Sequence, residues 1–263
     1  MIFYEKIFQH TFEINIRQYN AQIMKLKSPC ITFLLFALSF SFLTTSTLNC
    51  HSQTINEDQT GAWYMAFLRK NIEKSPFGLQ GDYQFRFWDT GTDLEQILLR
   101  TGVTYNPKKS NILWTLGYGH ISSGTPGKRT DIVKECRMYQ EALIPQKIGT
   151  RFFVTHRYRF EQRWVKGQDF RTRFRYNIFL NVPLNKPTLQ KNAVYVALYN
   201  EIFINGQLNI GNDRRVQYFD RNRTYLGMGY TVIDNLRGQL GWMNQTTASW
   251  QKAQAQVSMH YTF

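Results

Sequence analysis

The chain has 263 residues, 16% of them aromatic, and a formal net charge of +14. Its mean hydropathy of -0.42 excludes a helical membrane protein. The positive charge does not indicate nucleic acid as a partner, because the basic residues alternate with aromatic residues and form no basic run.

The first predicted element is an export signal near the N-terminus. An apolar run from Ile31 to Leu43 follows the basic residues after Met24 and precedes small and polar residues up to Ser52. The run is too short to span a bilayer as a helix, which takes about 20 residues, so it has the form of a signal peptide. We predict an upstream extension from a wrong start codon (1–23), a cleaved signal peptide (24–52) and a barrel (53–263); an uncleaved signal anchor is the alternative.

After residue 53 the sequence alternates between apolar and polar residues, in segments separated by turn-forming residues. In the segment 77–88, for example, Tyr83 and Phe85 share one face, and Asp82, Gln84 and Arg86 share the other. Segments of about 10 alternating residues are typical of membrane β-barrels, with one face toward lipid and one toward the lumen. The predicted strands are 61–69, 77–88, 94–106, 111–121, 134–144, 151–164, 170–182, 193–204, 219–230, 236–245 and 254–263.

These segments predict an all-β fold, an antiparallel up-and-down transmembrane β-barrel. Closure is required because each unpaired backbone group in hydrocarbon costs several kcal/mol. Single-chain bacterial barrels have an even number of strands, so we predict about 12 strands, with 10 as the alternative. A soluble secreted β-sandwich that acts as a binding protein also alternates and is a further alternative.

Two features predict the cellular location and the orientation of the barrel. Phe263 ends an alternating strand, like the sorting signal read by the barrel assembly machinery of the outer membrane. The connections at 106–110, 145–149 and 231–235 are expected to be short and periplasmic. Those at 122–133 and 205–218 are expected to be longer and external. The predicted location is the cell outer membrane, and the predicted partners are its lipids, the assembly machinery during insertion, and small anions.

Several segments of the chain resemble an uncharacterised outer-membrane barrel family of the Bacteroidota, domain of unknown function 2490. The resemblance covers about residues 60–263 and implies the address and the fold, but no activity. The segments that carry it are 135–140, 157–163, 171–176, 200–203, 220–223 and 226–230.

The polar faces of the strands predict a network of charges inside the barrel, in which arginines outnumber carboxylates. Arginine pairs with carboxylates through two parallel hydrogen bonds and stays charged when it is buried. The network predicts either a structural filling or a small, porin-like, anion-preferring pore or binding barrel. Its predicted members are Arg86, Arg100, Glu135, Arg137, Glu141, Arg157, Arg159, Glu161, Arg163, Arg171, Arg173, Arg175, Glu201, Arg221, Arg223 and Arg237.

A catalytic alternative depends on His120 and Ser122, which lie two residues apart in a predicted strand and therefore share a face. Outer-membrane lipid esterases and deacylases are similar at this point, with histidine as base and serine as nucleophile. No Asn or Asp is predicted beside His120 to orient it, so we expect the chain not to be an enzyme. No cofactor or metal site is predicted.

Overall fold

The computed structural model describes residues 55–263, apart from the side chains of residues 128–130. The predicted upstream extension (1–23) and signal peptide (24–52) lie outside these residues. Within the described part there is no helix that is long and apolar enough to cross a membrane.

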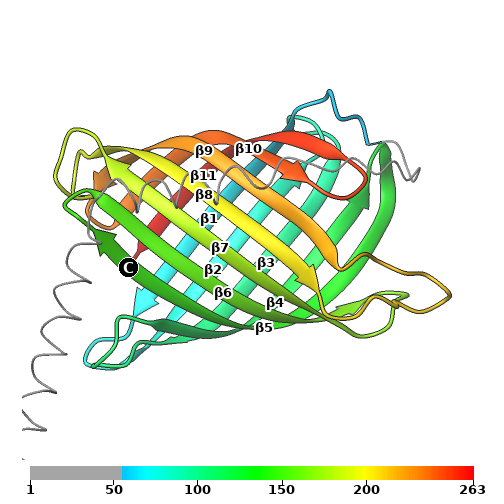
Figure 1. Cartoon of the computed structure of the whole chain (residues 1–263), viewed down its shortest axis with the longest axis horizontal. Helices are drawn as coiled ribbons and strands as arrows, with labels where there is room; N and C mark the ends of the chain where they lie inside the picture. The colour runs from blue at the N-terminus through cyan, green and yellow to red at the C-terminus, as the bar shows by residue number, and fades with distance from the viewer. Residues whose placement is uncertain (1–54) are drawn as a thin grey trace, which may run out of the picture. The chain divides into compact units, whose positions relative to one another are not determined.

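The described residues form a closed β-barrel of eleven strands (Figure 1). Each strand pairs with the strands before and after it in the chain, and all of these pairs are antiparallel. The strands are β1 (Gly61–Asn71), β2 (Phe77–Phe87), β3 (Leu94–Tyr105), β4 (Leu113–Thr125), β5 (Lys128–Ile148), β6 (Phe152–Val165), β7 (Arg171–Pro183), β8 (Val194–Asn205), β9 (Phe219–Ile233), β10 (Leu236–Thr246) and β11 (Gln251–Thr262).

The predicted number of strands, about 12 or else 10, is wrong. Residues 55–60 form no strand, and β1 pairs directly with β11 in parallel, from Gly61 opposite Gln254 to Arg69 opposite Thr262. The prediction assumed that every pair in the barrel is antiparallel, which requires an even number. A single parallel pair closes a barrel with an odd number of strands. As a result, Gly61 and Phe263 lie at opposite ends of the barrel, which we call the Gly61 end and the Phe263 end (Figure 1).

The lengths of the connections between strands do not support the predicted assignment of short loops to one side and long loops to the other. The segment 122–133 is not a long loop, since β4 and β5 continue as a ladder to a tight turn at Pro126 and Gly127. Gly127 has a φ of 70°, and proline followed by a glycine with positive φ is typical of a type II turn. The 206–218 connection at the Gly61 end is long, but so is the 184–193 connection at the Phe263 end. Connection lengths therefore do not distinguish the two ends.

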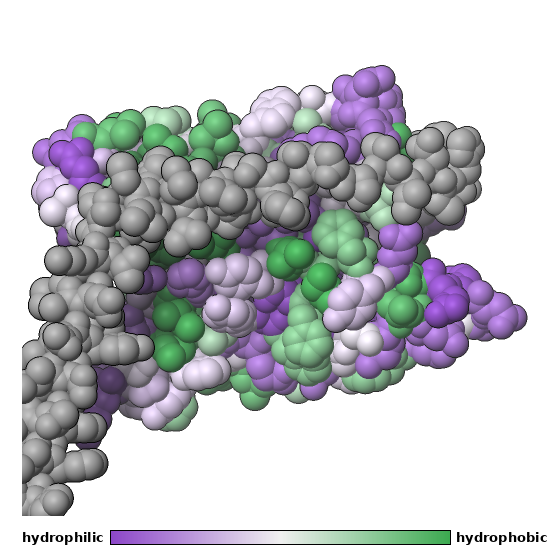
Figure 2. All heavy atoms as spheres, viewed as in Figure 1, coloured by the Kyte–Doolittle hydropathy of each residue, from purple (hydrophilic) through white to green (hydrophobic). Residues whose placement is uncertain are grey.

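Alternation places most side chains of the strands on the face that the sequence predicts. On β2, Leu79 and Phe85 are exposed on the outer face, while Asp82, Gln84 and Arg86 are buried. The same arrangement repeats around the barrel, so that many large apolar side chains are exposed and many charged ones are buried. Figure 2 shows apolar side chains on the outer face turned to the viewer, with polar ones between them and at the protruding loop.

Tyrosine rings fill part of the interior by lying over glycines on neighbouring strands. A Cβ atom at Gly117 would lie 2.1 Å from the Tyr139 ring, and one at Gly229 would lie 2.1 Å from the Tyr195 ring. The ring therefore occupies the space that a side chain at the glycine would need. Each such pair narrows the lumen without adding charge.

Candidate functional site

The interior of the barrel carries the predicted charge network. The odd-numbered residues of β5 to β9 and the even-numbered residues of β2 point inward, which brings arginines and carboxylates from all these strands together. Of the predicted members, Arg157, Arg221 and Arg237 are half-buried and all the others are buried. The interior is thus made of charged side chains that are shielded from solvent.

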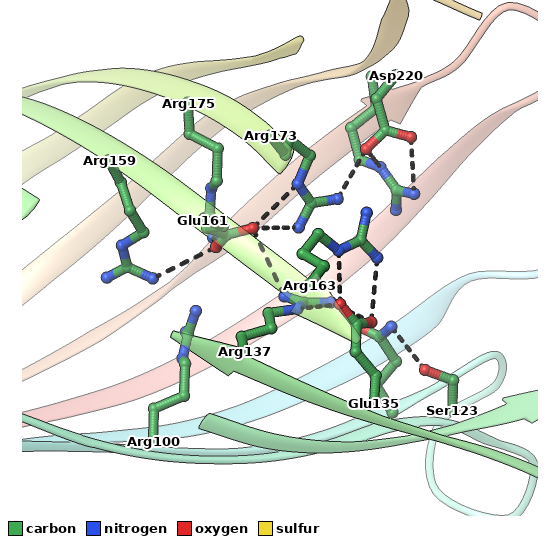
Figure 3. A network of polar contacts seen from close by, with 12 residues as sticks. Arg100, Ser123, Glu135, Arg137, Arg159, Glu161, Arg163, Arg173, Arg175 and Asp220 are labelled. Carbon is green, nitrogen blue, oxygen red and sulfur yellow. Dashed lines mark hydrogen bonds and ion pairs between the residues drawn. The ribbon is translucent and has the colours of Figure 1, made fainter. Parts of the chain in front are cut away.

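Glu161 on β6 is the centre of one part of the network (Figure 3). Its Oε2 accepts hydrogen bonds from Arg173 Nη2 at 2.7 Å and Nε at 3.0 Å, and its Oε1 accepts one from Arg175 Nη1 at 2.6 Å. Nη1 atoms of Arg137 and Arg159 lie 3.9 Å from its oxygens. One carboxylate therefore lies among four arginines and accepts hydrogen bonds from two of them.

Glu135 on β5 is a second centre, nearer the Gly61 end (Figure 3). Both of its oxygens accept hydrogen bonds from Arg137, at 2.6 and 2.8 Å, and from Arg163, at 2.5 and 3.0 Å. Two arginines bind it in the bidentate geometry that the guanidinium fork favours.

Glu141 and Glu201 are two further acidic centres of the network, nearer the Phe263 end than Glu161 and Glu135. Arg159 donates to Glu141 from Nε at 2.6 Å, and Arg175 donates to Glu201 from Nη2 at 2.6 Å. Arg157 Nη2 donates to Glu201 at 2.7 Å across β7, which separates their strands. Side chains of strands that are not neighbours therefore meet inside the barrel.

Aromatic rings hold two arginines that have few acidic partners. The guanidinium of Arg86 lies 3.7 Å from the centroid of the Trp63 ring, and that of Arg223 lies 4.7 Å from the same ring. Arg223 also lies 4.7 Å from the Phe203 ring. Such cation–π contacts stabilise a cation most where it is desolvated. Since β1 and β9 are separated by two strands, the Trp63–Arg223 contact also crosses the interior.

A cavity of about 380 Å³ occupies the interior on the Phe263 side of the network. Arg69, Arg237 and Thr262, near the Phe263 end, line one part of it, and Arg86, Arg159 and Arg175 line its inner part. We call this space the vestibule. The inner part of the vestibule lies against the arginines that bind Glu161 and Glu201.

Sequence reasoning missed three charged groups of the interior. Asp220 accepts a hydrogen bond from Arg173 Nη1 at 2.8 Å, and Glu95 accepts one from Trp63 Nε1 at 2.7 Å. Lys252 donates to the backbone oxygen of Asn56 at 2.8 Å. Glu95 and Asp220 lie at register shifts of their strands, which interrupt the alternation that assigns a face. Lys252 lies before the predicted strand 254–263.

The predicted pair His120 and Ser122 lies on the outer face of β4, as its sequence position indicates, but it is not joined by a hydrogen bond in the described structure. His120 instead contacts Cys136 on β5, whose Sγ lies 3.9 Å from Nδ1 and also accepts a hydrogen bond from the Tyr118 hydroxyl at 3.0 Å. The geometry therefore contains no base–nucleophile contact. Residues 55–263 also hold no cluster of three or more His, Cys, Asp or Glu side chains that could bind a metal.

Comparison with known proteins identifies a family. No curated protein and no solved structure matches the chain. A family model described as a protein of unknown function (DUF2490) matches residues 60–256, which span β1 to the first half of β11. The chain belongs to the DUF2490 family.

Proposed function

We propose that this protein is an outer-membrane β-barrel whose interior is closed by the ion-pair network. The observation that carries the proposal is the distribution of side chains between the two faces of the wall. Leu226 and Leu240 are 60% and 62% exposed on the outside, whereas Glu161 is 1% exposed on the inside. Large exposed apolar surfaces mark contact with a membrane or a partner, and a band that surrounds a barrel fits lipid.

The same distribution argues against a soluble protein. A soluble β-sandwich packs its apolar faces against each other in a dry core, but here one sheet closes on itself around charged groups. In water the exposed leucines and aromatic residues would have no compensating contact. In a bilayer the same residues would contact apolar lipid chains, and the closed wall leaves no sheet edge with unpaired backbone groups.

The interior contacts favour a closed barrel over an open anion-preferring pore. A pore requires a continuous water path, whereas Arg157 reaches Glu201 across β7 and Arg173 reaches Asp220 across β8. Glu135, Glu161 and their arginines are buried between the vestibule and the Gly61 end. Charged side chains therefore fill this part of the interior, which supports a structural role for the network.

Two measurements test the proposal. The purified protein is refolded with phosphatidylcholine vesicles, which are then floated through a density gradient after extraction with alkaline carbonate. The protein is expected to float with the vesicles, and recovery of folded protein in the aqueous fraction would refute the membrane assignment. In planar bilayers it is expected to give no steady conductance steps. Regular anion-selective steps would show that the interior is open and that the network is a pore lining.

A further inference from the structure

The vestibule has an unbalanced charge. Eight arginines and three carboxylates line it, so that its wall carries a formal excess of five positive charges. The arginines are Arg69, Arg86, Arg100, Arg157, Arg159, Arg175, Arg223 and Arg237, and the carboxylates are Asp82, Glu141 and Glu201.

Three of these arginines have no carboxylate within ion-pair distance in the described structure: Arg69, Arg86 and Arg237. Arg86 is the most informative, because its side chain is buried. Its guanidinium donates to the amide oxygens of Gln84 and Gln96, at 2.9 and 3.1 Å, which orient the group without neutralising it. A buried cation that no carboxylate contacts is costly, so the vestibule favours the entry of an anion.

Unpartnered polar atoms on the same wall point to a ligand independently of the charge count. Arg100 Nε, Arg157 Nε and Arg159 Nη1 are buried nitrogens without a hydrogen-bond partner, and so is Gln256 Nε2. All four residues line the vestibule. Since leaving a buried donor unsatisfied costs about 1–3 kcal/mol, a group of such donors around one cavity indicates acceptors that the chain itself does not supply.

We infer that the vestibule binds a small organic anion with several carboxylate or phosphate oxygens, which enters from the Phe263 end. Arginine forks bind both oxyanions in the bidentate geometry, and the excess of positive charge favours a multivalent ligand. The side chains of Met65, Phe67 and Phe179 also line the vestibule and provide contacts for the carbon part. A volume of about 380 Å³ lies within the range of small-molecule sites. This inference goes beyond the membrane role and does not depend on it.

Calorimetric titration of the refolded barrel in a zwitterionic detergent at low salt tests the inference, with citrate and inorganic pyrophosphate as probes. Saturable binding of at least one probe to one site is expected. Arg86→Gln, in the inner part, and Arg237→Gln, near the Phe263 end, are each expected to weaken it by at least about tenfold. The matched control is Arg171→Gln, which also removes one inward arginine charge. Arg171 makes no hydrogen bond or ion pair in the described structure and does not line the vestibule, so binding should be unchanged.

Three outcomes would overturn the inference: no saturable binding of either probe, equal weakening by all three substitutions, or full binding by Arg86→Gln and Arg237→Gln. Equal weakening would indicate a general attraction of anions to a basic protein. Heat-modifiable migration on a gel verifies that each variant is folded. Should Arg86→Gln not fold, the half-buried Arg237 still supplies the comparison with Arg171. Flotation with vesicles is a separate readout, so failure of the anion site leaves the membrane assignment intact.

Discussion

Replacing Glu161 by Gln is the sharpest test of whether the interior is dry. The substitution keeps the size of the side chain and removes its charge, which leaves Arg173 and Arg175 without the carboxylate that accepts their hydrogen bonds at 2.6 to 3.0 Å. Removing one partner of a buried ion pair destabilises a protein by about 3–5 kcal/mol. The same pairs in a water-filled pore would contribute about 0–1 kcal/mol each. The predicted loss of unfolding free energy therefore differs between the two models.

The assay is urea unfolding of the barrel refolded into vesicles, followed by tryptophan fluorescence. Glu161→Gln is expected to lower the unfolding free energy by about 3–5 kcal/mol. Glu73→Gln, an exposed carboxylate in the 72–76 connection, is the control and should change it by less than about 0.5 kcal/mol. Because Arg173 loses a partner in the single variant, the Glu161→Gln/Arg173→Gln double variant should be destabilised by less than the sum of the two. A loss below about 1 kcal/mol for Glu161→Gln would refute a dry, closed interior.

Three further predictions follow from the wall and its connections. Leu240→Arg places a charge on the outer face of β10 and is expected to cost about 2–4 kcal/mol in vesicles if the residue lies near the bilayer centre; no loss in the urea assay would contradict lipid contact. Ser122→Ala and wild type are both expected to show only background release of fatty acid from phospholipid vesicles, since His120 contacts Cys136 and not Ser122; release that Ser122→Ala abolishes would restore the catalytic alternative. Asp89 in the 88–93 connection accepts hydrogen bonds from the backbone N–H groups of Gly91, Thr92 and Asp93 at 2.8 to 2.9 Å. Burial acts to raise the pKa of the Asp89 carboxyl, but these bonds and the one from the Thr92 hydroxyl outweigh it and hold the pKa well below its usual value. Asp89→Asn should therefore destabilise the protein at neutral pH, and the difference from wild type should shrink as the pH falls below about 4; a difference that is constant with pH would show that the charge is not involved.

The strands and the two faces of the wall could be predicted because alternation is a local property of the sequence. All eleven predicted segments are strands in the structure. The ladder between Ile121 and Val133 was missed because glycine, serine and proline make this stretch look like a loop. The strand number was wrong because the direction of the pairing between β1 and β11 depends on closure of the whole barrel, and no local pattern reports it.

The candidate site could likewise be predicted only in part. The inward position of Arg159 or Glu161 follows from its place in the alternating strand, but its partners do not. Arg157 reaches Glu201 over an intervening strand, and such a contact depends on the tilt and stagger of the strands around the barrel. The vestibule is lined by residues of many strands that lie far apart in the sequence. Neither the partners of the charged residues nor the vestibule can be predicted from the sequence of a single segment.

The parallel seam between β1 and β11 has a consequence for topology mapping. Because the first and last strands run in the same direction, an epitope inserted just before Gly61 and another appended after Phe263 would face opposite compartments if the barrel spans the outer membrane as proposed. Protease treatment of intact cells should then remove one epitope and spare the other. An ordinary even-stranded barrel would expose or protect both together, so this experiment tests whether the first and last strands run in the same direction.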